Sequence, residues 1–207
     1  MEESYSAHGE DKLIFDFIPK KSFGRYIDIG AGTPKIINNT YMLYRMGWEG
    51  LLVEPSPILT PLLSKTRPKD ILYKGALLHY TGEVILCTKN CYGITEESWI
   101  YGSHKARAMG EGFKVKEFKV RCTTLPKLIK RYPQFKEPDF VSIDVDGNED
   151  HILRTINFEV FKPTLILMEY GLRQIDHRAI WGHYLTDYYD VVWENGSDCF
   201  YLRKGGK

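Results

Sequence analysis

The sequence has few cysteines, no long apolar run and no excess of one charge. Four cysteines in 207 residues are too few and too scattered for a disulfide scaffold. Lys and Arg number 28 against 27 Asp and Glu, so the net charge of +1 creates no field that attracts nucleic acid or an anionic membrane. No stretch approaches the roughly 18 apolar residues of a membrane helix. We therefore expect no nucleic-acid partner and no membrane span.

The chain also lacks a linker, a repeat and a recognisable leader. Residues 1–12 are polar and acidic, without the basic and then apolar layout of a signal peptide, so we expect a cytoplasmic protein with reduced cysteines. Hydrophobic residues make up 43% and charged residues 27%, which excludes global disorder. This length suits one domain, predicted over residues 1–207. The sequence leaves open whether the protein forms a homo-oligomer.

Short apolar runs alternate with stretches of helical periodicity. Strands are predicted at 25–29, 51–53, 71–73, 140–145 and 165–168, and helices at 33–48, 57–66, 125–132, 148–156 and 176–187. This alternation predicts an α/β fold with a Rossmann-like, mostly parallel sheet. Two further strands, 191–193 and 199–202, are close in sequence and are expected as an antiparallel pair at the sheet edge.

Residues 78–121 interrupt the alternation. Strand patterns at 83–88 and 118–122 flank a glycine-rich polar segment, 92–112, which predicts an inserted hairpin with a long irregular loop. Long loops in compact domains are usually functional or disordered, so we expect a lid over an acceptor site. Its aromatic residues suit stacking on a sugar, although they can equally fold onto the core. The candidate acceptor contacts are His8, Tyr92, Trp99, Tyr101 and His104.

Most of the chemically notable residues fall at the predicted strand ends, where open α/β sheets bind their ligands. Asp28, Gly30, Ala31 and Gly32 end the first strand, Glu54 and Pro55 the second, Ala76 the third, Asp144 and Asp146 the fourth, and Glu169 the fifth. Glu54 follows Gly32 by the spacing typical of a carboxylate that binds ribose hydroxyls. These residues predict a nucleotide-like ligand.

Two ligands use such a layout, and the glycine pattern separates them. A dinucleotide site needs a third glycine, but Lys35 stands there, and Asp28 would repel a pyrophosphate. The same acid suits the cationic amino-acid portion of S-adenosylmethionine (SAM). Asp-x-Gly-x-Gly with the downstream Glu54 therefore favours SAM over NAD.

The residues resemble the FkbM-type SAM-dependent methyltransferases. The first half of the resemblance comprises Ser6–Asp11, Tyr26–Gly32, Asn39-Thr40, Leu43-Tyr44, Gly47-Trp48 and Val53–Pro55; the second comprises Thr124-Leu125, Ile143–Glu149, Pro163 and Met168-Glu169. Two positions depart from the family pattern: Asp146 stands where Glu is usual, and Ala7 where Gln is usual. The resemblance implies a class I methyltransferase fold and methylation of an oxygen, commonly on a sugar or secondary metabolite.

Methyl transfer to a hydroxyl needs alignment of the reacting atoms and a base. The candidate bases are the acids Asp144, Asp146, Glu149 and Glu169, and Asp144 is also expected beside Asp28 at the mouth of the site. Asn148 is expected as the N-cap of the next helix. A divalent metal held by the acids is an alternative that we do not favour. An N-methyltransferase and a SAM-binding regulatory module also remain open.

Overall fold

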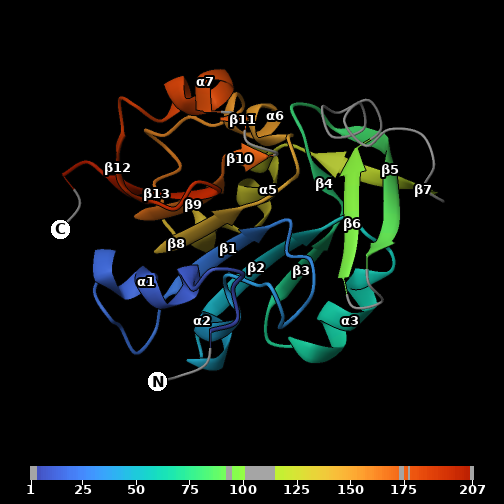
Figure 1. The fold of residues 1–207 in the computed structure, drawn as a ribbon, viewed down its shortest axis with the longest axis horizontal. Coiled ribbons are helices and arrows are strands. Elements are labelled where there is room, and N and C mark those ends of the chain that lie inside the picture. The colour runs from blue at the N-terminus through green and yellow to red at the C-terminus, as the bar shows by residue number, and fades with distance from the viewer. Residues whose placement is uncertain (1–3, 92–94, 101–114, 173–174, 177, 206–207) are drawn as a thin grey trace.

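The computed structural model describes residues 4–91, 95–100, 115–172, 175–176 and 178–205 (Figure 1). Its strands are β1 Arg25–Ile29, β2 Glu49–Glu54, β3 Ile71–Lys74, β4 Ala76–Leu77, β5 Gly82–Cys91, β6 Thr95–Ile100, β7 Lys116–Thr123, β8 Phe140–Ile143, β9 Leu165–Glu169, β10 Gly171–Leu172, β11 Ile175–Asp176, β12 Tyr189–Glu194 and β13 Asp198–Arg203. Its α-helices are α1 Glu10–Phe17, α2 Tyr41–Arg45, α3 Leu59–Thr66, α5 Leu125–Arg131, α6 Glu149–Leu153 and α7 Arg178–Trp181.

The central sheet has seven strands in the order β12-β13-β9-β8-β1-β2-β3. Strand β1 pairs in parallel with β2 on one side and with β8 on the other, so that Ile29 lies between Val53 and Ile143. Strand β13 runs antiparallel to both β9 and β12. The predicted α/β fold, the mostly parallel sheet and the antiparallel C-terminal strands are thus confirmed.

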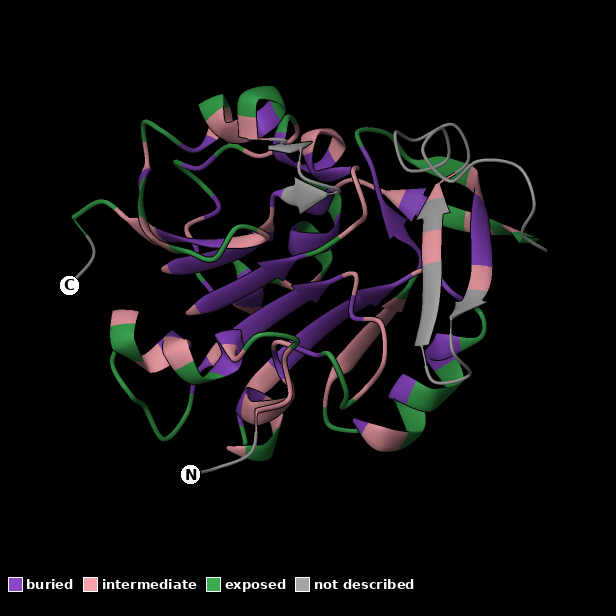
Figure 2. Cartoon of the chain, in the orientation of Figure 1, coloured by how far each residue is buried: buried purple, intermediate pink, exposed green. Residues whose placement is uncertain are grey.

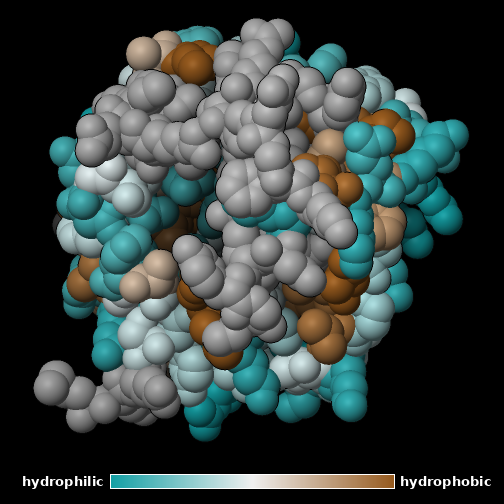
Figure 3. All heavy atoms as spheres, turned by 45° about the vertical axis from the view of Figure 1, so that its right-hand side comes forward, coloured by the Kyte–Doolittle hydropathy of each residue, from teal (hydrophilic) through white to brown (hydrophobic). Residues whose placement is uncertain are grey.

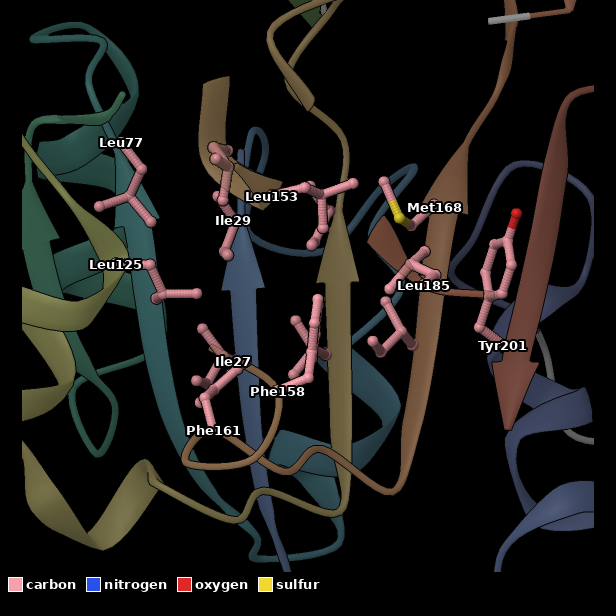
Figure 4. Packing of buried hydrophobic residues seen from close by; sticks show 14 of the residues in the cluster. Ile27, Ile29, Leu77, Leu125, Leu153, Phe158, Phe161, Met168, Leu185 and Tyr201 are labelled. Carbon is pink, nitrogen blue, oxygen red and sulfur yellow. The ribbon is translucent and has the colours of Figure 1, made fainter. Parts of the chain in front are cut away.

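Apolar side chains cover both faces of this sheet, as expected for parallel strands buried on both sides. On one face, Ile27, Ile29 and Met168 pack with residues of α5, α6 and α7 (Figure 4). On the other face, Tyr26 and Leu52 pack with residues of α1, α2 and α3. The central strands are buried along most of their length (Figure 2). Alternation along β1 directs Asp28 toward the second face, with Tyr26.

A second sheet, of four strands in the order β4-β7-β5-β6, contains the described part of the predicted insertion. It lies beside the ends of β1 and β2 (Figure 1). Hydrophobic residues, brown in Figure 3, reach the surface on the side of the molecule that Figure 3 turns forward. One expectation was wrong: Thr95–Ile100, predicted as irregular, is strand β6, which runs antiparallel to β5. Backbone pairing with β5 gives this segment a structure that its own composition does not predict.

Two predicted helices are shorter than expected. Residues 33–39 form a loop, because the Asn38 side chain donates hydrogen bonds to the carbonyl oxygens of Ala31 and Thr33. Ile37 there has a φ of 53°, and the helix begins only at Tyr41. In the range 176–187, the α-helix is limited to α7, followed by a 3₁₀ turn, Gly182–Tyr184. Among the described residues, no helix has the length and apolar character needed to cross a membrane.

Candidate active site

A cavity of about 340 Å³ opens at the carboxyl ends of β1, β2 and β8. Seven of the predicted site residues line it: Gly30, Gly32, Glu54, Pro55, Ala76, Asp144 and Asp146. The remaining lining residues are Ile29, Thr33, Ile37, Val53, Leu59, Leu77, Leu86, Ser98, Ile100, Val145 and Asn148. The cavity thus brings together groups that lie more than a hundred residues apart in the sequence.

The glycine turn after β1 forms one side of the cavity. The amide groups of Gly30 and Ala31 both donate to the carbonyl oxygen of Val53, which fixes the turn against β2. Gly30 and Gly32 have φ values of 84° and 57°, a region that residues with a Cβ rarely adopt. A Cβ at Gly30 would lie 1.8 Å from the carbonyl oxygen of Asp144. Glycine is therefore required where the ends of β1 and β8 meet.

This close approach leads to a stability prediction. Gly30→Ala should lower the free energy of unfolding by about 1–3 kcal/mol, since the turn must move away from the β8 end. Gly182→Ala is the matched control, because a Cβ there meets no atom nearer than 3.7 Å. Urea unfolding of both variants measures the difference. Equal unfolding free energies would show that the turn adapts without cost.

Glu54, at the end of β2, is buried and joins two turns. Its Oε2 accepts a hydrogen bond from the Gly32 amide at 2.8 Å, and its Oε1 accepts one from the Ser56 amide at 2.7 Å. A carboxylate oxygen has more than one acceptor site, so both oxygens can still accept hydrogen bonds from a ligand in the cavity. The side chain can therefore hold the glycine turn and a ligand hydroxyl at the same time.

Three acids form a cluster at the ends of β8 and β9. Asp144, Asp146 and Glu169 each place a carboxylate oxygen within 4.8 Å of the others. The Asp144 side chain is open to the cavity, yet protein atoms crowd its carboxylate from the other sides. This desolvation, and then the charges of Glu169 and Asp146, raise the pKa of Asp144 well above its usual range.

The pKa of Glu169, in the same cluster, is raised as well. Desolvation, followed by the charges of Asp146 and Glu149, raises the pKa of Glu169 to about 7. A carboxyl group with such a pKa can take up or release a proton near neutral pH. The arrangement is suited to general-base chemistry on a ligand in the cavity.

Asn148 is the N-cap residue of α6, as expected, and Glu149 begins the helix. Asn148 precedes α6 but makes no side-chain cap; its Nδ2 instead donates to the Val145 carbonyl oxygen at 3.1 Å. Glu149 is buried, and its Oε1 accepts hydrogen bonds from the amide groups of Gly147 and Val145. It therefore supports the turn that presents Asp146, whose φ is 54°. Glu149 thus stabilises the turn, and its role as a base stays a prediction, while Asn148 lines the cavity.

Asp28 and Ala31 are buried next to the cavity but are not among its lining residues. The Asp28 Oδ2 accepts hydrogen bonds from Thr40 Oγ1 at 2.6 Å and from Asn38 Nδ2 at 3.3 Å. It also lies 3.8 Å from Arg67 Nη1. Asp28 is thus held by Thr40, Asn38 and Arg67, and its expected place beside Asp144 at the mouth of the site stays a prediction. Its contact with a cofactor stays a prediction.

The predicted acceptor residues are not assembled by the described part of the chain. His8 is exposed, and its Nδ1 lies 3.3 Å from Glu10 Oε1 rather than in the cavity. Trp99 belongs to β6, but its side chain lies outside the described residues, as do Tyr92, Tyr101 and His104. An acceptor role for these four residues therefore stays a prediction.

Sequence reasoning missed one wall of the cavity, formed by the second sheet. The residues on this wall that line the cavity are Leu77, Leu86, Ser98 and Ile100. Ser98 and Ile100 are two residues apart, so they project from the same face of β6. That alternation is the signal in the sequence, but it is weak because β6 has only six residues.

Comparison with known proteins finds a matching family model and weakly similar solved structures. The family model described as "Methyltransferase FkbM domain" matches residues 28–196. A TehB-like SAM-dependent methyltransferase from Corynebacterium glutamicum is 10% identical, with a TM-score of 0.49 over 96% of this chain and 89% of the other. Precorrin-6y C5,15-methyltransferase from Geobacter metallireducens is also 10% identical, with a TM-score of 0.47 over 97% and 92%. No curated protein matches the chain.

Proposed function

Since this chain belongs to the FkbM methyltransferase family, we propose that it is a SAM-dependent O-methyltransferase acting on a hydroxyl of a sugar, a glycan or a small metabolite. The observation that carries the proposal is the acid cluster, of which Asp144 and Asp146 line the cavity. An alcohol stays protonated at neutral pH, so its oxygen needs a base as it attacks. Asp144 and Glu169 supply carboxyl groups whose raised pKa values suit that role.

The residues of the cavity fit SAM. At the β1 turn, Gly30 leaves room where any Cβ would strike Asp144, and Gly32 exposes backbone to the cavity. At the end of β2, Glu54 offers acceptors for two ribose hydroxyls, with Pro55 beside it. When bound, SAM supplies an activated methyl group on a sulfonium.

The chain itself supplies alignment and proton transfer. Strands β2 and β8 flank β1, so Glu54 and Asp144 lie on opposite sides of the glycine turn. A donor held by Glu54 at one end places its charged portion near the acids at the other end. In this arrangement an acceptor hydroxyl donates to Asp144, and the Asp144–Glu169 pair takes the proton as the oxygen is methylated. Holding the reacting atoms in line contributes about 7–11 kcal/mol in favourable cases.

The reaction itself is tested with methyl-labelled SAM and a panel of acceptors. We expect label on sugars or hydroxylated metabolites, with fragment masses that place the methyl group on oxygen. Label on nitrogen would identify an N-methyltransferase. Binding of the demethylated product, S-adenosylhomocysteine (SAH), without turnover of any acceptor would favour a regulatory module. Loss of turnover in EDTA, with recovery on adding Mg²⁺, would show that the acids hold a metal.

Substitutions at Glu54 test its proposed role in binding the donor. Glu54→Ala should weaken SAH binding by about 1.5–3 kcal/mol, because ribose hydroxyls lose a charged acceptor. Glu54→Gln should also weaken binding, since its amide group would face the Gly32 or Ser56 amide. Isothermal titration calorimetry measures the affinity. The exposed Glu159→Ala is the control, and unchanged affinity in both Glu54 variants would contradict the assignment.

A further inference from the structure

One wall of the cavity is formed by the inserted sheet and not by the central sheet. Leu77 of β4, Leu86 of β5, and Ser98 and Ile100 of β6 face the cavity together. Leu86 lies directly opposite Ile100 in the antiparallel pair, so the two side chains share one face. Leu86, Ser98 and Ile100 belong to the insertion, residues 78–121, that the sequence predicts as a lid over the acceptor. Their position favours contact with the methyl donor instead of the acceptor.

The wall lies on the donor side of the cavity. Strand β4 follows β3 almost directly, and the amide of Gly75 between them donates to the carbonyl oxygen of Glu54. Leu77 is therefore held close to the end of β2. The acid cluster lies at the ends of β8 and β9, on the other side of β1. A donor whose ribose binds Glu54 can extend its reactive end toward the acids only if its base extends toward the wall.

The chemistry of the wall matches a flat aromatic base with a polar edge. Leu77, Leu86 and Ile100 supply apolar surface, and Ser98 supplies one hydroxyl. Thr88 lies opposite Ser98 on β5, and its buried Oγ1 has no hydrogen-bond partner among the described residues. Side chains that are opposite in an antiparallel pair share a face, so the wall carries two hydroxyls at one end.

We propose that β6 binds the purine ring of SAM. Ile100, Leu86 and Leu77 pack against the ring, and the hydroxyl of Ser98 hydrogen-bonds its polar edge, with Thr88 behind it. This inference rests on the proposed function and assigns part of the insertion to the donor instead of the acceptor. The hairpin is then needed for cofactor affinity itself.

Calorimetry with two ligands tests the proposal. SAH carries the 6-amino group of adenine, and S-inosylhomocysteine carries an oxo group in its place. Ile100→Ala should weaken the binding of both ligands at least about tenfold, because an apolar contact with the ring is lost. Ser98→Ala should weaken SAH binding about tenfold, because a hydrogen bond to the polar edge of the base is lost.

Ile85→Ala is the matched control, because Ile85 neighbours Leu86 on β5 and projects from the opposite face. Melting temperatures establish that each variant folds, and Ile100→Val provides a milder change that should weaken binding in the same direction. If the wild type binds SAH and the Ser98 and Ile100 variants bind it equally well, the proposal is wrong while the proposed function stands. If the wild type binds neither ligand, the proposed function fails as well.

Discussion

Asp144→Asn should lower the turnover number at least about 100-fold while leaving the melting temperature nearly unchanged. The substitution preserves the shape of the side chain and removes its charge and basicity. Asp144, like Asp146, lines the cavity and belongs to the carboxylate cluster, and its own carbonyl oxygen lies against Gly30. A residue that only stabilised the turn would tolerate the amide, so turnover within a few-fold of wild type would contradict a catalytic role.

The pH dependence of the wild type follows from the same cluster. A general base must be deprotonated to act, and the pKa of Glu169 is raised to about 7. Activity should therefore fall as the pH decreases through about 7, because a carboxyl pair that already holds a proton cannot take one from the acceptor hydroxyl. In the Glu169→Gln variant, the residual activity should lose this decrease near pH 7 or show it at a different pH. Asp190→Asn, at an exposed position, is the control and should keep the wild-type profile.

The sequence was sufficient for the central sheet because strands buried on both faces are nearly continuous apolar runs. The runs at 140–145 and 165–168 became β8 and β9 within two residues. Adjacent carboxyl ends also follow from parallel pairing, so the meeting of Gly30, Glu54 and Asp144 in one cavity was predictable.

Features set by individual hydrogen-bond and strand partners were not predictable. The spacing of Ile37, Tyr41 and Tyr44 suits a helix, but the hydrogen bonds of Asn38 to its own loop end that pattern. Strand β6 forms because β5 offers it backbone partners. Asp28 was interpreted through its local motif, yet its partner Arg67 comes from the end of α3. No local pattern identifies Arg67 as that partner.

Arg67 lies at the centre of a buried polar network beneath the glycine turn. Its side chain is fully buried; Nε donates to Asp70 at 2.7 Å and Nη2 donates to the hydroxyl of Tyr26 at 2.8 Å. Nη1 donates to Asn38 Oδ1 at 3.1 Å. Because Asn38 also holds the carbonyl oxygens of the turn, Arg67 connects folding stability with the shape of the donor site.

Arg67→Met should therefore lower the free energy of unfolding by about 3–5 kcal/mol, since Asp28 and Asp70 would remain buried without their cation. Desolvation already raises the pKa values of both acids, and Arg67 opposes that rise. In the variant the folded state would bind protons more tightly than the unfolded state, so the stability deficit should grow as the pH rises and shrink in mild acid.

Urea unfolding at several pH values measures this deficit, and SAH titration measures its effect on the donor site. Arg154→Met, which removes only a partly exposed pair with Asp150, is the control and should cost less than about 1 kcal/mol. Arg67→Lys should be intermediate, because an ammonium keeps the charge but cannot reach Tyr26, Asn38 and Asp70 together as the guanidinium fork does. A loss in Arg67→Met no larger than in Arg154→Met would show that Asp28 and Asp70 are stabilised without Arg67.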